Sequence, residues 1–208
     1  MQTPEDTLLN HVKHVIDVIQ KRLATHDRPI VVAIDGGSGS GKSSLAALIQ
    51  NPMDVALIPL DDFFSAHIPD QQWDPFTPEE KLEHVFDWKR LRQQVIEPLL
   101  RGETARWQAF DFIAGPQPDG TYPMQNEYKH LKPAPVILIE GAYSASPPLA
   151  DLIDLAVLVD VPTEVRHARL VDREAHAFLS RWHALWDPVE DHYFNHVRPK
   201  ETFDIVIF

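Results

Sequence analysis

The chain has 208 residues and a formal net charge of −12; 44% of its residues are hydrophobic and 24% are charged. These values predict one globular domain, 1–208, whose core needs no disulfide to hold it, and they argue against non-specific binding to nucleic acid or anionic membranes. The absence of cysteine excludes disulfides, thiolate zinc sites and cysteine nucleophiles. The first ten residues lack the basic start and apolar stretch of a signal peptide, so we expect a cytoplasmic protein.

Helix and strand patterns alternate along the chain. Apolar residues at helical spacing predict a first helix from Thr3 to Leu23, and the β-branched run Ile30–Ile34 predicts a buried strand. Further strands are predicted at 55–60, 136–139, 155–159 and 204–208, and further helices at 42–50, 87–100, 162–179 and from Asp187, where Asp-Pro-Val-Glu resembles a capping box. This alternation predicts an α/β fold: a mostly parallel five-stranded sheet flanked by helices in three layers.

Two proline-rich stretches, 65–78 and 114–135, show neither a helical nor a strand period. Long loops in a compact domain usually cover or bind a ligand. We therefore expect lid or acceptor-binding excursions near 65–86, 104–135 and 166–186. The alternative is that these segments are surface loops without a function.

The strongest motif is a glycine-rich loop, Gly36-x-x-x-x-Gly41-Lys42-Ser43, between a predicted strand and a predicted helix. Its glycines let backbone N–H groups converge on an anion, Lys42 supplies a charge for the β- and γ-phosphates, and Ser43 supplies a hydroxyl for Mg²⁺. The motif predicts a P-loop NTPase fold that binds a nucleoside triphosphate. We expect ATP as phosphoryl donor and Mg²⁺ as cofactor; GTP is an alternative donor. The expected nucleotide-binding residues are Gly36, Gly37, Ser38, Gly39, Ser40, Gly41, Lys42, Ser43 and Ser44.

Carboxylates follow two of the predicted strands. Asp61 and Asp62 end the second strand, where ligands bind in parallel sheets, and one of them can accept a hydroxyl proton or help to hold Mg²⁺. It is equally compatible with the sequence that Asp61 and Asp62 are ordinary aspartates of a turn, without a catalytic role. Glu140 ends an apolar strand in the manner of a Walker B carboxylate; a solvated residue at a strand end is the alternative.

Arg166, Arg169 and Arg173 share one face of a predicted helix and can clamp a transferring phosphoryl group. The alternative is that these arginines are exposed to solvent and form ion pairs with Asp172 and Glu174. Two other pairs at i, i+4 receive no functional prediction. His192 and His196 lack a surrounding zinc motif, and Trp182 and Trp186 are interpreted as a packing stripe.

Taken in order, several segments resemble the uridine kinase-like P-loop kinases, a group that also includes phosphoribulokinase and the bacterial pantothenate kinases. These segments are the loop 36–43, Leu60–Phe64, Trp73-Asp74-Pro75, Phe110-Asp111-Phe112, Glu140-Gly141, the arginine helix and the closing segment 198–207. The resemblance implies an ATP-dependent small-molecule kinase that phosphorylates a hydroxyl group.

The resemblance also implies residue roles. Lys42, Asp61, Arg166, Arg169 and Arg173 would be catalytic, with Asp61 as base and Mg²⁺ partner. Ser43 and Glu140 would complete the metal site. The acceptor would contact Asp61, Phe64, Asp74, Phe110 and Arg166, with Asp74 holding its hydroxyls and Phe110 packing against it.

Departures from the pattern concern the acceptor. Residues 113–116 offer no base-reading histidine, and Phe64 replaces the usual tyrosine. We predict a nucleoside acceptor, as in uridine kinases. Pantothenate, a sugar or a sugar phosphate is an alternative acceptor, and a regulatory ATPase without kinase activity is an alternative function. We expect no nucleic-acid or membrane partner, and a homo-oligomer is compatible with the sequence.

Overall fold

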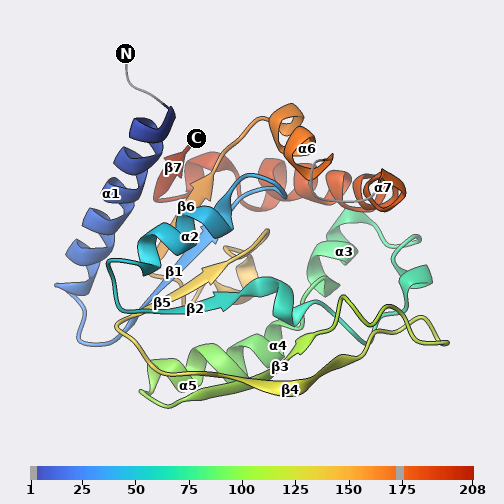
Figure 1. The fold of residues 1–208 in the computed structure, drawn as a ribbon, viewed down its shortest axis with the longest axis horizontal. Helices are drawn as coiled ribbons and strands as arrows, with labels where there is room; N and C mark the ends of the chain where they lie inside the picture. Colours follow the sequence, from blue (N-terminus) through green and yellow to red (C-terminus); the bar gives the residue numbers. More distant parts are fainter. Residues whose placement is uncertain (1–3, 172–175) are drawn as a thin grey trace.

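The computed structural model describes residues 4–171 and 176–208. A five-stranded parallel sheet has the order β2-β5-β1-β6-β7 (Figure 1). In that order its strands are Val55–Pro59, Val136–Glu140, Ile30–Asp35, Leu155–Val159 and Ile205–Ile207. The apolar runs of β1 and β6 are buried along their whole length, as expected for strands covered on both faces. The predicted five-stranded α/β sheet is confirmed.

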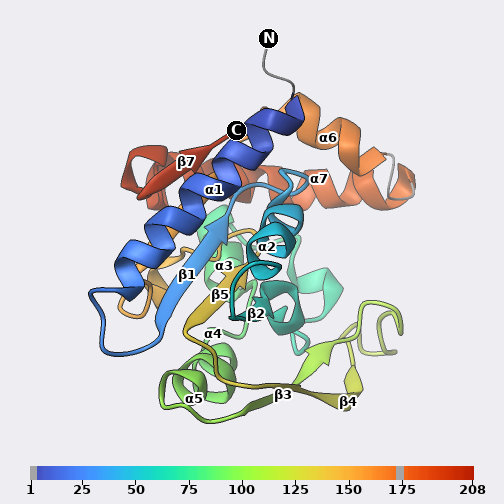
Figure 2. The ribbon, with the colours of Figure 1, turned by 60° about the vertical axis from the view of Figure 1, so that its left-hand side comes forward.

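Helices cover both faces of this sheet. On one face lie α1 (Pro4–Leu23) and α2 (Lys42–Gln50), whose apolar residues pack with alternate residues of β1 and β5 (Figure 2). The other face packs against α4 (Trp88–Leu91), a π-helical turn at Arg92–Ile96, α5 (Glu97–Leu100) and part of α7 (His176–His192). The predicted three layers are therefore present.

A β-hairpin lies apart from the main sheet, beside α4 and α5 (Figures 1 and 2). Its antiparallel strands are β3 (Ala105–Phe110) and β4 (Met124–Leu131). The prediction that 114–135 lacks regular structure is thus wrong for 124–131. Polar residues dominate β4 and none of them is fully buried, so the strand carries no apolar alternation to detect.

The helices after β6 also differ from the prediction. The predicted helix 162–179 corresponds to α6 (Thr163–Val171) and the start of α7, with 172–175 outside the described residues. The prediction of a new helix at Asp187 is wrong, because α7 continues through Pro188. Trp186 and Val189 are buried on either side of the proline, and their packing stabilises the helix despite one missing N–H donor.

A short helix that the sequence analysis missed, α3 (Pro78–His84), begins with a capping box between Thr77 and Glu80. The remaining short helical turns are Leu60–Phe63, Asp70–Gln72, Pro147–Leu149, Tyr193–Val197 and Lys200–Thr202. In the described part of the chain, no helix has the length and apolar character needed to cross a membrane.

Candidate active site

The glycine-rich loop joins β1 to α2 and packs tightly against α6 and α7. Gly41, directly before α2, has φ of +103°, which L side chains rarely adopt. A Cβ atom on Gly37 would lie 2.3 Å from Nη1 of Arg166 and 2.7 Å from Oε2 of Glu190. The loop therefore needs glycine for backbone conformation at one position and for close packing at another.

Lys42 begins α2 and is buried, and its Nζ donates a hydrogen bond to the carbonyl oxygen of Gly37 at 3.0 Å. Burial lowers the pKa of its ammonium group, and the negative charges of Asp35, Asp61 and Glu140 work in the opposite direction. Its charge stands at the N-terminus of α2, where the free N–H groups and the helix dipole also favour an anion. This is the expected place for phosphate oxygens.

Ser43 and Glu140 come from different elements and meet beside Lys42. The Ser43 hydroxyl lies 3.2 Å from each carboxylate oxygen of Glu140. Burial raises the pKa of Glu140, whereas the charge of Lys42 lowers it. A hydroxyl and a partly buried carboxylate are the hard oxygen donors that Mg²⁺ prefers, so these residues fit the predicted metal.

Asp61 and Asp62 lie in different surroundings although they are adjacent. Asp61 lines the same cavity as Lys42, Ser43 and Glu140. Asp62 accepts hydrogen bonds from Nε1 of Trp107 and Nζ of Lys129, all at 2.8 Å, and so fastens the β-hairpin to the turn after β2. Only Asp61 of the two lines the cavity.

The cavity has a volume of about 1040 Å³ and extends from the glycine-rich loop in two directions. One wall comes from α1 and the last residue, with His11 against Phe208 at 5.6 Å between ring centroids. Another wall is aromatic and is formed by Phe64, Phe86, Phe112, Trp182 and Trp186. The two tryptophans, interpreted from sequence as a packing stripe, thus also line the cavity.

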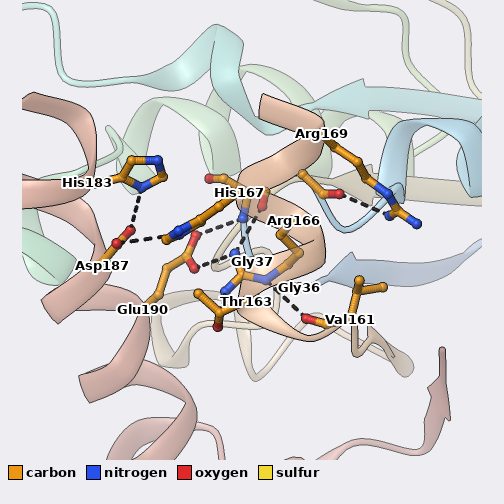
Figure 3. Close-up of polar contacts among 12 residues, drawn as sticks. Gly36, Gly37, Val161, Thr163, Arg166, His167, Arg169, His183, Asp187 and Glu190 are labelled. Carbon is orange, nitrogen blue, oxygen red and sulfur yellow. Dashed lines mark hydrogen bonds and ion pairs between the residues drawn. The ribbon is translucent and has the colours of Figure 1, made fainter. Parts of the chain in front are cut away.

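The three predicted arginines have different positions. Arg166 is buried and donates from Nε to Val161 O, from Nη1 to Ser38 O and Glu190 Oε2, and from Nη2 to Thr163 Oγ1 (Figure 3). Arg169 lines the cavity and donates to the carbonyl oxygens of Gly39 and Ser40, both at 3.2 Å. Arg173 lies outside the described residues, as do Asp172 and Glu174.

Three predicted acceptor residues, Arg166, Asp74 and Phe110, do not line the cavity. Asp74 is exposed and lies 3.4 Å from Nη1 of Arg181. Phe110 is buried behind Phe64 and Phe112, with ring centroids 5.2 and 4.4 Å away. The structure therefore brings together Lys42, Ser43, Asp61, Phe64, Glu140 and Arg169. The assignment of Arg166, Asp74 and Phe110 to the acceptor stays a prediction.

Asp35, the last residue of β1, was not predicted as a site residue, and it is fully buried. Its carboxylate accepts hydrogen bonds from the N–H groups of Gly36, Tyr143 and Ala145 at 2.7 to 2.9 Å, and from the Tyr193 hydroxyl at 2.6 Å. Burial raises its pKa, while these hydrogen bonds lower it. Asp35 thus joins the segment after β5 to the start of the phosphate loop. An acidic residue that ends an apolar strand, as at Glu140, is the signal that could have revealed it.

Comparison with known proteins is consistent with this geometry. Residues 31–201 match the family model described as Phosphoribulokinase / Uridine kinase family. The chain belongs to this family. A uridine kinase of Oceanobacillus iheyensis is 28% identical over 182 residues, which span 84% of this chain and 80% of the relative. The chain is therefore a small-molecule kinase with a P-loop.

Solved structures of other kinases share the fold. A Bacillus stearothermophilus protein described as a possible uridine kinase superposes with a TM-score of 0.63 at 19% identity, over 94% of this kinase and 100% of that chain. The D-glycerate 3-kinase of Cryptococcus neoformans has a TM-score of 0.55 at 16% identity, over 93% and 88% of the two chains. Because these proteins differ in their named acceptors, the fold alone does not determine the acceptor.

Proposed function

We propose that this kinase transfers the γ-phosphoryl group of Mg-ATP to a hydroxyl group of a nucleoside such as uridine. The observation that carries the proposal is the meeting of Lys42, Ser43, Glu140 and Asp61 at one cavity beside the glycine-rich loop. Together they offer a phosphate-binding charge, two metal ligands and a carboxylate for the acceptor hydroxyl. The cytoplasm, where we expect the protein, would supply ATP.

On the donor side, the N–H groups of the loop and the Lys42 ammonium group would bind the β- and γ-phosphates. Ser43 and Glu140, with Asp61, would hold Mg²⁺, which supplies positive charge to the oxygens between the two phosphates. Of the arginines that the structure describes, Arg169 is the one that would contact the transferring phosphoryl group, since it lines the cavity. Arg166 would act through the loop that it braces, as a positioning residue.

On the acceptor side, Asp61 would accept the proton of the attacking hydroxyl. It lies in the same cavity as Lys42 and Glu140, and its charge acts on both of these groups. A carboxylate in this position orients the hydroxyl and also takes its proton. Both effects would raise the rate of phosphoryl transfer.

The aromatic wall supports a ring-bearing acceptor. Phe64 and Trp186 have ring centroids 5.8 Å apart, and Trp182 adds a third ring at 5.7 Å from Trp186. Flat apolar surfaces of this kind favour stacking with a nucleobase over binding of a small polar acid. The uridine kinases among the relatives point to the same acceptor class.

An acceptor panel tests this proposal. The chain would be incubated with Mg-ATP and, in turn, uridine, cytidine, adenosine, pantothenate, a free sugar and a sugar phosphate, while ADP and the phosphorylated product are measured. We expect a pyrimidine nucleoside to give the highest kcat/KM. A higher value for pantothenate or a sugar would overturn the nucleoside assignment, and ADP release independent of every acceptor would indicate a regulatory ATPase.

The predicted role of Asp74 is tested separately, because the structure places it at the surface. If Asp74 holds acceptor hydroxyls, Asp74→Asn should raise KM for the acceptor and leave KM for ATP unchanged. Equal kinetics in the variant and the wild type would remove Asp74 from the acceptor site.

A further inference from the structure

A cluster of possible metal ligands lies between α6 and α7. Nε2 of His167 is 3.4 Å from Oδ2 of Asp187, and Nδ1 of His183 is 3.0 Å from Oδ1 of the same carboxylate. One ligand atom from each residue lies within 4.8 Å of the other two. Figure 3 shows the two imidazoles, which come from different helices, next to the Asp187 carboxylate, and their ring centroids are 3.9 Å apart.

One atom of the cluster is unsatisfied. Nε2 of His167 is buried; it lies 3.4 Å from Oδ2 of Asp187, but it makes no hydrogen bond with any residue that the structure describes. A buried polar nitrogen without a hydrogen-bond partner costs free energy, and such atoms are uncommon in native proteins. A cation bound between His167 and Asp187 would satisfy this nitrogen.

The separations suit a small tetrahedral ion. Zinc–ligand bonds of about 2.0 to 2.2 Å place neighbouring ligand atoms roughly 3.3 to 3.6 Å apart. The contacts at 3.4 and 3.0 Å, which reach the two different oxygens of Asp187, are close to this range. Since one ligand atom from each residue lies within 4.8 Å of the other two, side-chain adjustment would bring all three to one ion. Two imidazoles and one carboxylate favour Zn²⁺, Co²⁺ or Ni²⁺ over Mg²⁺ and leave a fourth position for water.

The spacing of the residues supports a cross-link between helices. His183 and Asp187 are i, i+4 on α7 and share one face, whereas His167 belongs to α6. Arg166, the neighbour of His167, forms an ion pair of 2.8 Å with Glu190, and both residues hydrogen-bond Ser38. An ion at the cluster would therefore fix the two helices where they brace the phosphate loop.

We propose that His167, His183 and Asp187 bind a divalent transition-metal ion such as Zn²⁺, which ties α6 to α7. The site uses none of the residues assigned to Mg²⁺ and is independent of the identity of the acceptor. Its role is to hold the arrangement of α6, α7 and the phosphate loop, so binding can be tested without measuring kinase activity.

Calorimetric titration of the whole chain with Zn²⁺, in buffer containing excess Mg²⁺ and no nucleotide, tests the site. We expect one equivalent to bind, and His167→Gln and Asp187→Asn each to weaken binding by about tenfold or more. The matched control is His196→Gln, which changes an exposed histidine whose ring centroid lies 5.5 Å from that of His192. The control should bind Zn²⁺ as the wild type does.

Thermal unfolding provides a second readout. Excess Zn²⁺ should raise Tm of the wild type by about 5 °C, and this rise should disappear in both ligand variants. Circular dichroism without metal would verify that the variants are folded. The proposal is overturned if the wild type binds no Zn²⁺ in the presence of Mg²⁺, if both ligand variants bind as tightly as the wild type, or if His196→Gln removes the binding.

Discussion

At the scale of single residues, a few charges around one cavity define the site. Lys42 is buried, and four carboxylates support its positive charge. The loop motif predicts this lysine, the Ser43 hydroxyl and the nucleotide that they bind. The choice between Asp61 and Asp62 required the structure, because neighbouring carboxylates at a strand end have the same sequence signal. Only the fold reveals that Trp107 and Lys129 bind Asp62.

The lysine gives the first prediction. Lys42→Ala should lower turnover by on the order of 10²-fold or more, because one preorganised charge on the transferring group is lost. Steady-state ADP release measures the effect. Lys13→Ala, which removes an exposed lysine from α1, is the matched control and should leave turnover unchanged. Unchanged turnover in Lys42→Ala would remove this side chain from the mechanism.

Glu140 gives a prediction about pH. Burial raises its pKa in the folded chain, so the group stabilises the fold below its unfolded pKa of about 4.5 and loses that contribution as pH rises through the folded value. Glu140→Gln has no such group. In the absence of Mg²⁺, the free energy of unfolding of the variant should therefore increase relative to wild type as pH rises from about 4.5 through the raised folded pKa.

Urea denaturation in EDTA across this pH range measures that difference. The same variant should lose kinase activity, because the metal site loses a charged ligand. A difference in stability that does not change with pH would contradict the assigned environment of Glu140.

At the scale of elements, α7 supports the phosphate loop through Glu190. Its side chain is 7% exposed; Oε1 accepts the N–H of Ser38 at 2.7 Å, and Oε2 pairs with Arg166 at 2.8 Å. Glu190→Gln leaves the Arg166 charge buried without its partner. The free energy of unfolding should fall by about 3 kcal/mol or more, and KM for ATP should rise.

Urea denaturation and ATP titration of turnover check this prediction. Glu201→Gln, which changes an exposed glutamate, is the control and should alter the stability by less than about 0.5 kcal/mol. If Glu190→Gln loses no more than this control, the ion pair does not hold α7 to the loop.

Sequence pattern predicted the elements that bury apolar surface. The five strands of the main sheet, α1, α2 and the helical run over 88–100 follow from apolar periodicity and from caps such as Asp87, whose carboxylate accepts the N–H of Arg90. Strand β4 was missed because polar contacts, such as that between Lys129 and Asp62, hold a strand with no apolar face. Strand β3 does bury alternate residues, Ala105, Trp107 and Ala109, so its signal was present and was overlooked. The false helix start at Asp187 arose because tertiary packing overrides a local capping signal.

At the scale of the whole molecule, an acidic chain gathers cations at its anion site. The net charge is −12, yet Lys42 and Arg169 line the cavity and the N-terminus of α2 faces it. Such an arrangement favours a bound polyphosphate that carries its own metal ion, because Mg²⁺ offsets charge that the acidic surroundings would repel. The proposed acceptor site includes the aromatic wall, whose residues follow the turn Leu60–Phe63, precede α4, follow β3 and belong to α7, and so could not be assembled from sequence.

The central claim is that Asp61 activates an acceptor hydroxyl in this cavity. It is tested most directly by comparing Asp61→Asn with Asp62→Asn, measuring both ATP affinity and formation of the phosphorylated nucleoside. We expect Asp61→Asn to bind ATP and to lose acceptor phosphorylation by on the order of 10²-fold or more. Asp62→Asn should keep turnover while the free energy of unfolding falls by about 1 to 3 kcal/mol, because Trp107 and Lys129 lose a charged partner. Retained phosphorylation in Asp61→Asn, or its loss in a folded Asp62→Asn variant alone, would contradict the account.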